Sequence, residues 1–505
     1  MRSKADLGTK FAHKTPEILM KRFIPLSCVL LLSTSALAAC GSDDNTDNAT
    51  TLPECPVNAL ESVTSPVDIT LWHSYVGPLK ATLESIAASY NASQSKVRVK
   101  VENQGKSYED LLRKYQQAVP SKSLPALSIG EDIDTRYMAA SGTVIPAQAC
   151  MDADPDPRAQ LSDVLPAIKS YYTVDKTLYP VSFNSSTVMQ FYNKAHFVAA
   201  GLDPEKPPTT LDEMYQTAKK LKEWKPSNKP LVMKMDSWFI EHWLNGAGVA
   251  LVNNDNGHSG QATETNFNNE TTKKIFNWLV KMKSEGLLDA VPSTDSQIDH
   301  YLAVATQASS ILLETSASIT TIKGVLDGTF KAADLGQQDN PNVSKYNGIK
   351  IDLDVGVAPN IGVDGPAVGQ VGGGAWYLTN TGSPQVQAAG WDFAKYYNDA
   401  QQQIRWTTEG SYLPILTSAA QNPELNKIFT ETRKGKWLKT AFDSMSKIPA
   451  SFPGAQMGPF TKYRESVKHA LEAITIGDGT ASVDEALTKA AAEMNAEFVT
   501  FNESV

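Results

Sequence analysis

The residue types that most often carry catalysis or bind metals follow no recognised catalytic or metal-binding spacing here. There is no H-E-x-x-H, no pair of C-x-x-C motifs and no G-x-S-x-G, and the seven histidines are scattered without the spacing of metal ligands. Gly105-Lys106-Ser107 matches the tail of a phosphate-binding loop, but the upstream glycine that this motif requires falls on Lys100. We therefore expect no enzyme, no metal site and no cofactor.

Glycines and aromatic residues instead favour a binding site for a small polar molecule. Gly372-Gly373-Gly374 precede a predicted strand, and consecutive glycines let a backbone approach a ligand closely and offer unshielded N–H donors. The same glycines also suit a crossing between two lobes, where side chains would clash. A few aromatic side chains lining a cleft would stack on ligand carbons. The candidates are Trp72, Trp238, Trp243, Trp376, Tyr377 and Tyr412.

Size and charge restrict the class of protein and of partner. A chain of 505 residues is long enough for two or more domains, and 41% hydrophobic with 20% charged residues is a globular composition. The formal net charge of −9 argues against nucleic acid as the main partner, because a phosphate backbone requires a basic face. A small anion held by one or two local cations is compatible with this charge.

The N-terminal region is typical of an exported lipoprotein. Met20-Lys21-Arg22 precedes a short apolar run and then small residues, which is the layout of a secretory signal. The run ends in Leu37-Ala38-Ala39-Cys40, which resembles a bacterial lipobox and implies cleavage before Cys40 and acylation of its thiol. An ordinary signal peptide with a chance cysteine is the alternative. We expect a signal peptide over 1–39, with Met20 as an alternative start, and a lipidated cysteine with a polar tether over 40–59.

Two further cysteines agree with export. Cys55 and Cys150 remain after the signal and the lipidated cysteine are set aside, and an exported protein enters a compartment that permits disulfides. We expect a bridge that staples the N-terminal segment and has no catalytic role. Two free thiols are the alternative.

The order of predicted elements indicates an α/β fold. Residues 67–72 alternate apolar and polar side chains, and 97–101 alternate again after a stretch with helical spacing. Ser107 is placed to cap a helix from Tyr108 to about Val119. This strand–helix–strand–helix start predicts the opening of a parallel sheet.

Several segments resemble a known family. Ile69-Thr70-Leu71-Trp72-His73-Ser74 is similar to the first strand of family 1 extracellular solute-binding proteins of ABC importers. Later segments resemble, more narrowly, the sn-glycerol-3-phosphate-binding subunits within that family, and the similarity extends with gaps over 65–495. These segments are Phe183-Asn184-Ser185-Ser186-Thr187, Tyr192-Asn193-Lys194, Ala200-Gly201-Leu202-Asp203-Pro204-Glu205, Pro207-Pro208-Thr209, Gly372-Gly373 and Gly410-Ser411-Tyr412-Leu413-Pro414-Ile415.

The resemblance implies a two-lobed periplasmic-binding-protein fold of type II, like that of maltose-binding protein. Lobe one would contain 60–183 and 306–372, and lobe two 184–305 and 373–505. The ligand would lie in the cleft between two α/β lobes. Closure around it would present a surface to the permease.

The resemblance also implies a set of ligand-binding residues. A phosphate needs several neutral donors and a fork-shaped cation, and the matching positions supply both. They are Ser186, Thr315 where the family has serine, Ser316 beside it, the backbone N–H of Gly373, Tyr412 and Arg464. A surface salt bridge with Glu465 or Asp484 is the alternative interpretation of Arg464 when it is considered without the resemblance.

The glycerol end of the ligand would meet a tyrosine and a carboxylate. Tyr108 would pack on the ligand or hydrogen-bond to it. The acidic position falls on Asp132, where the family has glutamate, and the adjacent Glu131 is an equal candidate. Either carboxylate accepts hydrogen bonds from vicinal hydroxyls.

The expected function is that of a binding subunit for an ABC importer, lipid-anchored at the periplasmic or extracytoplasmic face. Its ligand would be sn-glycerol-3-phosphate or a glycerophosphodiester such as glycerophosphocholine. The second ligand remains an alternative because Asp132 and Thr315 differ from the glutamate and serine that the family has at these positions. A binding subunit for a sugar or oligosaccharide is one alternative. A lipid-anchored hydrolase of glycerophosphodiesters is the other, and the missing metal and nucleophile motifs disfavour it.

Overall fold

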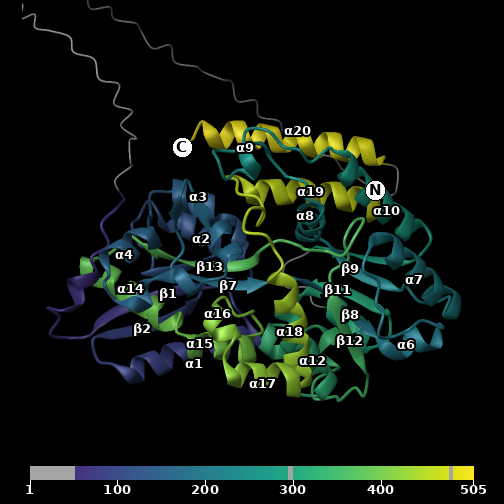
Figure 1. Ribbon diagram of the computed structural model, residues 1–505, viewed down its shortest axis with the longest axis horizontal. Coiled ribbons are helices and arrows are strands. Elements are labelled where there is room, and N and C mark those ends of the chain that lie inside the picture. The colour runs from purple at the N-terminus through teal and green to yellow at the C-terminus, as the bar shows by residue number, and fades with distance from the viewer. Residues whose placement is uncertain (1–51, 294–298, 477–480, 505) are drawn as a thin grey trace, which may run out of the picture. The chain divides into compact units, whose positions relative to one another are not determined.

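Two mixed β-sheets form the framework of the protein in a computed structural model that describes residues 52–293, 299–476 and 481–504. The predicted signal peptide, Cys40 and most of the predicted tether lie outside the described residues. Each sheet is the centre of one lobe (Figure 1). A separate two-stranded hairpin is formed by β5 (Thr173–Val174) and β6 (Thr177–Leu178).

The first sheet has the order β2-β1-β3-β13-β4, with β7 also paired to β13. Its strands are β1 (Val67–His73), β2 (Val97–Asn103), β3 (Leu127–Glu131), β4 (Val144–Ile145), β7 (Ser182–Ser186) and β13 (Gly372–Thr379). β1 runs parallel to β2 and to β3, which confirms the parallel opening expected from the sequence. In β1 the side chains of Ile69 and Leu71 are buried on one face, as the alternating pattern predicts.

The second sheet has the order β10-β9-β11-β8-β12. Its strands are β8 (Val188–Asn193), β9 (Leu231–Met235), β10 (Leu288–Pro292), β11 (Ile311–Thr315) and β12 (Val355–Pro359). Every residue of β8 is buried, which is expected for a central strand covered on both faces. The chain passes from the first sheet to the second at Thr187, the single residue between β7 and β8.

The strand pairing corrects the predicted lobe boundaries. β11 and β12 fall in 306–372, which was predicted for lobe one, yet both pair with β8 in the second sheet. β13 falls almost entirely in 373–505, predicted for lobe two, yet it pairs with β3 and β7 in the first sheet. The prediction failed because the boundaries were inferred from a resemblance carried by short segments, which does not show which sheet a strand outside those segments joins.

Helices pack on both sheets. On the first sheet lie α1 (Gly77–Ser93), α2 (Tyr108–Ala118) and α14 (Pro384–Tyr397), and on the second lie α10 (Glu270–Ser284), α18 (Arg433–Met445) and α19 (Phe460–Thr475). The Ser107 side chain accepts from the Asp110 N–H and caps α2 as predicted. The remaining α-helices are α3 (Thr135–Ala140), α4 (Ala147–Ala153), α5 (Pro166–Tyr171), α6 (Lys194–Ala199), α7 (Leu211–Trp224), α8 (Ser237–Gly246), α9 (Asn253–Asn256), α11 (Leu302–Ala305), α12 (Ile319–Asp327), α13 (Pro341–Ser344), α15 (Ala400–Arg405), α16 (Thr417–Ala420), α17 (Pro423–Glu431) and α20 (Val483–Asn502).

A disulfide ties the start of the described chain to the first lobe. Cys55 and Cys150 are bonded, as the sequence predicts, and both are buried. Cys150 lies in α4, so the bridge fixes the segment that precedes β1 against the lobe. In the part of the chain that the structure describes, no helix combines the length and the apolar character needed to cross a membrane.

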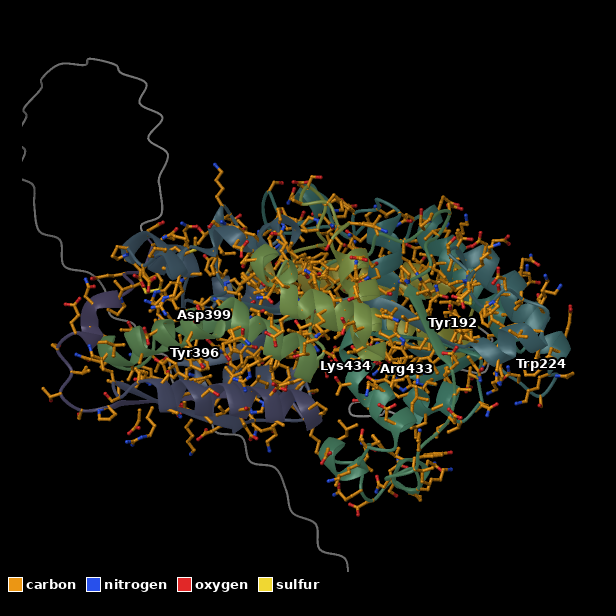
Figure 2. The ribbon with its side chains drawn as sticks, turned by 60° about the horizontal axis from the view of Figure 1, so that its bottom comes forward. Tyr192, Trp224, Tyr396, Asp399, Arg433 and Lys434 are labelled. Carbon is orange, nitrogen blue, oxygen red and sulfur yellow. A yellow bond between two sulfur atoms is a disulfide. The ribbon has the colours of Figure 1, made fainter. Side chains whose placement is uncertain are left out.

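The lobes also touch through α18. Lys434 Nζ donates to the carbonyl of Thr408 at 2.5 Å, and Thr408 lies in a π-helical turn that packs on α1 of the first lobe. Figure 2 shows Lys434 between Asp399 of the first lobe and Tyr192 of the second. Burial, with the neighbouring Lys323, lowers the pKa of Lys434 to about 8.

Candidate functional site

Several of the sequence-predicted residues meet where the two sheets approach each other. β3 ends at Glu131, which lies opposite Gly374 at the start of β13, and Gly372 lies opposite Ser186 at the end of β7. Because these strand ends share one edge of the first sheet, residues far apart in the chain become neighbours. The fold thus brings Glu131, Ser186 and Gly373 to the same region of the molecule.

Arg464 on α19 is the cation at the centre of this region. Its side chain is 13% exposed, and its Nη1 donates to Glu131 Oε1 at 2.7 Å. Its Nε and Nη2 donate to the two oxygens of Glu241 at 2.9 and 2.8 Å, a bidentate pair on one edge of the guanidinium. The same Nη2 reaches Asp132 Oδ2 at 3.5 Å. We call Arg464, Glu131, Asp132 and Glu241 the Arg464 cluster.

The Arg464 cluster spans the two lobes. Glu131 and Asp132 lie at the end of β3 in the first lobe, whereas Arg464 and Glu241 lie on α19 and α8, which pack together in the second. The Glu241 and Asp132 side chains are 1% and 2% exposed, while that of Glu131 is 26% exposed. Glu131 is therefore the one carboxylate of this cluster that solvent or a ligand reaches directly.

Burial changes the protonation of these acids. Burial raises the pKa of Glu131 to about 8 and that of Asp132 to about 7, although Arg464 acts in the opposite direction on both. Repulsion between neighbouring carboxylates adds to the rise. Asp134, which accepts from the Glu131 N–H, has its pKa raised to about 8 by burial and by Glu131. Near neutral pH the acids therefore carry less negative charge than their number implies.

Tyrosines form a wall beside the cluster. The hydroxyls of Tyr108 and Tyr412 are 3.0 Å apart and hydrogen-bonded. The ring of Trp406 stacks on Tyr412 with centroids 5.8 Å apart and ring planes within 7°. Burial raises the pKa of Tyr412 to about 12, so its hydroxyl is a neutral donor at physiological pH. Tyr412 and Trp406 are buried behind Tyr108, which lines the cleft and is the member of this wall that a ligand meets first.

The predicted hydroxyls near β11 are engaged with the backbone. Ser316 Oγ accepts from the Thr187 N–H at 3.2 Å, and the Thr315 Oγ1 accepts from the Ala317 N–H at 3.2 Å. Both side chains therefore stabilise the crossing and the turn after β11 in this structure. Ser186 is buried at the crossing itself.

Gly373 is held in a conformation that favours glycine. Its φ is +120°, and a Cβ at this position would lie 1.9 Å from the carbonyl oxygen of Asn184. The absence of a side chain is therefore required by the close passage of β7. This supports the structural interpretation of the glycines, since Gly373 lies in the ladder that pairs β13 with β7.

A cleft of about 610 Å³ opens beside the Arg464 cluster. Three sequence-predicted residues line it, namely Tyr108, Glu131 and Arg464, whereas the other predicted residues are not part of its lining. Its other lining residues are Ser107, Glu109, Ile133, Lys234, Asp236, Ser237, Ser293, Thr461, Glu465, Lys468 and His469. A hollow of similar size, about 600 Å³, lies beside α7 and contains none of the predicted site residues.

Sequence reasoning missed the residue that holds Arg464 most firmly. Glu241 carries no motif and lies 223 positions from Arg464, so only the fold reveals the pair. Lys468 lies one helical turn after Arg464 on α19, and that spacing was a usable signal for a second cation in the cleft. Trp238, named above as a cleft candidate, packs over Gly372 beside the site.

Comparisons with known proteins agree with this architecture. Residues 85–430 match a family model described as bacterial extracellular solute-binding protein. The sn-glycerol-3-phosphate-binding periplasmic protein UgpB of Yersinia pseudotuberculosis is 26% identical over 418 residues, covering 82% of this chain and 88% of that protein. UgpB of Escherichia coli strain 536 is 25% identical over 420 residues, with 82% and 88% covered.

Solved structures show the same fold. UgpB of Mycobacterium tuberculosis in complex with glycerophosphocholine has a TM-score of 0.65 at 16% identity, covering 88% of this chain and 100% of that one. The cyclic α-maltosyl-1,6-maltose-binding protein of Arthrobacter globiformis has a TM-score of 0.63 at 22% identity, with 86% and 100% covered. The fold is thus the two-lobed type II, maltose-binding-protein-like α/β fold expected from the sequence.

Proposed function

This chain belongs to the bacterial extracellular solute-binding protein family, and from that premise we propose that it captures a glycerophosphodiester such as glycerophosphocholine in the cleft beside Arg464. Members of this family are the substrate-binding proteins of ABC importers. They act outside the cytoplasm, bind a small ligand without converting it, and deliver it to a membrane permease.

The observation that carries the proposal is the position of Arg464, a buried guanidinium whose end meets the cleft next to tyrosine hydroxyls. A phosphodiester carries one negative charge, which this cation and the neutral donors of Tyr108 and Tyr412 would balance. Glycerol hydroxyls would donate to Asp132, or to Glu131 once the ligand has displaced it from Arg464. Ser186 and the Gly373 N–H are further donors at the same sheet edge, and Thr315 and Ser316 would join them once released from their backbone contacts.

The charge of the cluster favours a zwitterion over glycerol-3-phosphate. One guanidinium faces Glu241 and two further acids whose pKa values are raised to about 8 and about 7, so the cluster has no excess positive charge for a phosphate dianion, while a quaternary ammonium would be attracted by the aromatic faces. The names of the relatives are consistent with this ligand class, since UgpB proteins are named for glycerol-3-phosphate and one is solved with glycerophosphocholine.

A neutral sugar is the second candidate. Carboxylates and an arginine beside aromatic rings also suit sugar hydroxyls, and solved sugar-binding proteins are as similar in structure as UgpB. A sugar ligand would depend on the Tyr108 and Tyr412 wall and would be insensitive to competing phosphate.

The ligand class is tested by thermal unfolding of the purified protein with glycerophosphocholine, glycerol-3-phosphate or maltotriose. A ligand at 100 times its dissociation constant stabilises the folded state by about 2.7 kcal/mol, so a rise in Tm of a few degrees is expected with glycerophosphocholine. A rise with maltotriose alone would establish the sugar alternative. Free choline is assayed in the same samples, because its release would reveal the hydrolase that we do not expect.

We also propose that Cys40 carries a lipid that anchors the protein to a membrane after removal of residues 1–39. Cys40→Ser is expected to move the protein from the membrane fraction to the soluble fraction and to abolish labelling by a fatty acid. Cys28→Ser, inside the predicted signal peptide, is the matched control and is expected to change neither. Membrane recovery of the Cys40→Ser variant at the wild-type level would contradict the anchor.

A further inference from the structure

The two edges of the Arg464 guanidinium have different partners. Glu241, which is 1% exposed, binds the Nε and Nη2 edge with both oxygens and also accepts from Gln370 Nε2 at 3.0 Å. This edge is closed to a ligand and fixes the orientation of the guanidinium. The opposite end, Nη1 and Nη2, points to Glu131 and Asp132 across the boundary between the lobes.

Glu131 lies at the position where an anion entering the cleft would bind. It lines the cleft, it is the most exposed acid of the Arg464 cluster, and it makes the 2.7 Å contact with Nη1. A carboxylate and a phosphodiester offer the same chemistry to a guanidinium, namely paired anionic oxygens. A phosphodiester that binds the Nη1 and Nη2 end with two oxygens would have to displace Glu131, because that end offers one N–H group from each nitrogen and Glu131 already accepts from Nη1.

From this geometry we infer that the Glu131 carboxylate is an internal competitor for the ligand's anionic group at Arg464, and that Glu241 is the positioning residue that holds the guanidinium ready for either. The inference rests on the proposed function and adds that the ionisation state of Glu131 sets the affinity of the site for anions. Ionised Glu131 holds the lobes together and lowers affinity for anions. Protonated Glu131 binds Nη1 more weakly, so the ligand's anionic oxygen can replace it there.

The competition makes binding pH-dependent with a defined sign. With the pKa of Glu131 raised to about 8, the acid is mostly protonated at pH 7 and mostly ionised at pH 9. Raising the pH therefore strengthens the competitor and weakens ligand binding. The groups that face or surround Glu131 are Arg464, Asp132, Asp134, Asp236, Glu109 and Glu241, together with Lys234, Glu465, Lys468 and His469 in the lining of the cleft.

Glycerophosphocholine is the suitable probe, because a phosphodiester and a quaternary ammonium keep fixed charges from pH 6.5 to 9. Its affinity for the wild-type protein is expected to fall about tenfold between pH 7 and pH 9, the consequence of ionising one competing group with a pKa near 8. Glu131→Gln is expected to bind about tenfold more tightly than wild type at pH 9 and to lose most of the fall in affinity between pH 7 and pH 9.

The matched control is Glu465→Gln, which removes an acid from the same cleft. Glu465 pairs with Lys462 at 2.7 Å and makes no contact with Arg464 among the described residues, so its replacement is expected to keep the wild-type pH profile. Thermal unfolding of each variant checks that it is folded.

Four results would overturn the inference. A Glu131→Gln variant that keeps the tenfold fall would locate the titration elsewhere. A Glu131→Gln variant that binds tenfold more weakly at all pH values would make Glu131 a direct ligand contact instead of a competitor. Wild-type binding without pH dependence would reject the competition alone, whereas no wild-type binding at any pH would reject the proposed function as well.

Discussion

Arg464→Ala is expected to reduce the affinity for glycerophosphocholine by at least about thirtyfold, because a buried charge-assisted contact contributes about 2–5 kcal/mol when one partner is removed. The same change leaves Glu241 and Asp132, which are 1% and 2% exposed, without their shared counter-charge. Leaving a buried charge unpaired costs about 3–5 kcal/mol of folding stability. We therefore expect a lower Tm together with the loss of binding, measured by thermal unfolding and calorimetric titration.

Two further variants separate binding from folding. Arg464→Lys keeps the positive charge but not the planar fork, so it is expected to retain most of the stability and still lose most of the affinity. Lys462→Ala removes an exposed cation from the same helix and is expected to change neither. A folded Arg464→Ala protein with wild-type affinity would show that Arg464 does not bind the ligand.

Replacing both Cys55 and Cys150 with serine is expected to lower the free energy of unfolding by about 2–5 kcal/mol. The bridge closes a loop with a sequence separation of 95, and a long loop gains the most conformational entropy in the unfolded chain when it is released. Urea unfolding under oxidising conditions measures the change. Ligand affinity should stay at the wild-type value, because neither cysteine lines the cleft or contacts the Arg464 cluster among the described residues.

The wild-type protein with and without a reductant is the matched control for this comparison. Reduction is expected to shift the urea midpoint of the wild type and to leave that of the double variant unchanged. A double variant with the wild-type midpoint would mean that packing alone holds the N-terminal segment against α4.

Local elements were predictable because short-range patterns determine them. The alternation in β1 and the cap at Ser107 both depend on residues within a few positions of one another. The lobe boundaries were not, because the resemblance behind them does not show which sheet 311–315 and 372–379 join, and the two segments pair with different sheets. Which sheet a strand joins depends on pairing with distant segments, and one sequence does not contain that information in its local pattern.

The site was predictable in part, because the resemblance supplied individual positions. The positions carried over by resemblance include Glu131, Tyr108 and Arg464, which the fold does bring to one cleft. No local pattern pointed to Glu241. Its bidentate contact occupies the Nε and Nη2 edge of Arg464, so only the other end of the guanidinium remains for a ligand, and Glu131 competes for that end. That contact depends on α8 packing against α19, a tertiary feature.

Isothermal titration calorimetry at pH 7 of the purified protein with glycerophosphocholine, glycerol-3-phosphate and maltose in parallel decides which ligand the cleft beside Arg464 binds. We expect micromolar or tighter binding of glycerophosphocholine, weaker binding of glycerol-3-phosphate and no heat of binding with maltose. Binding of maltose alone, or of none of the three, would contradict the assignment of the Arg464 cluster as a site for a glycerophosphodiester.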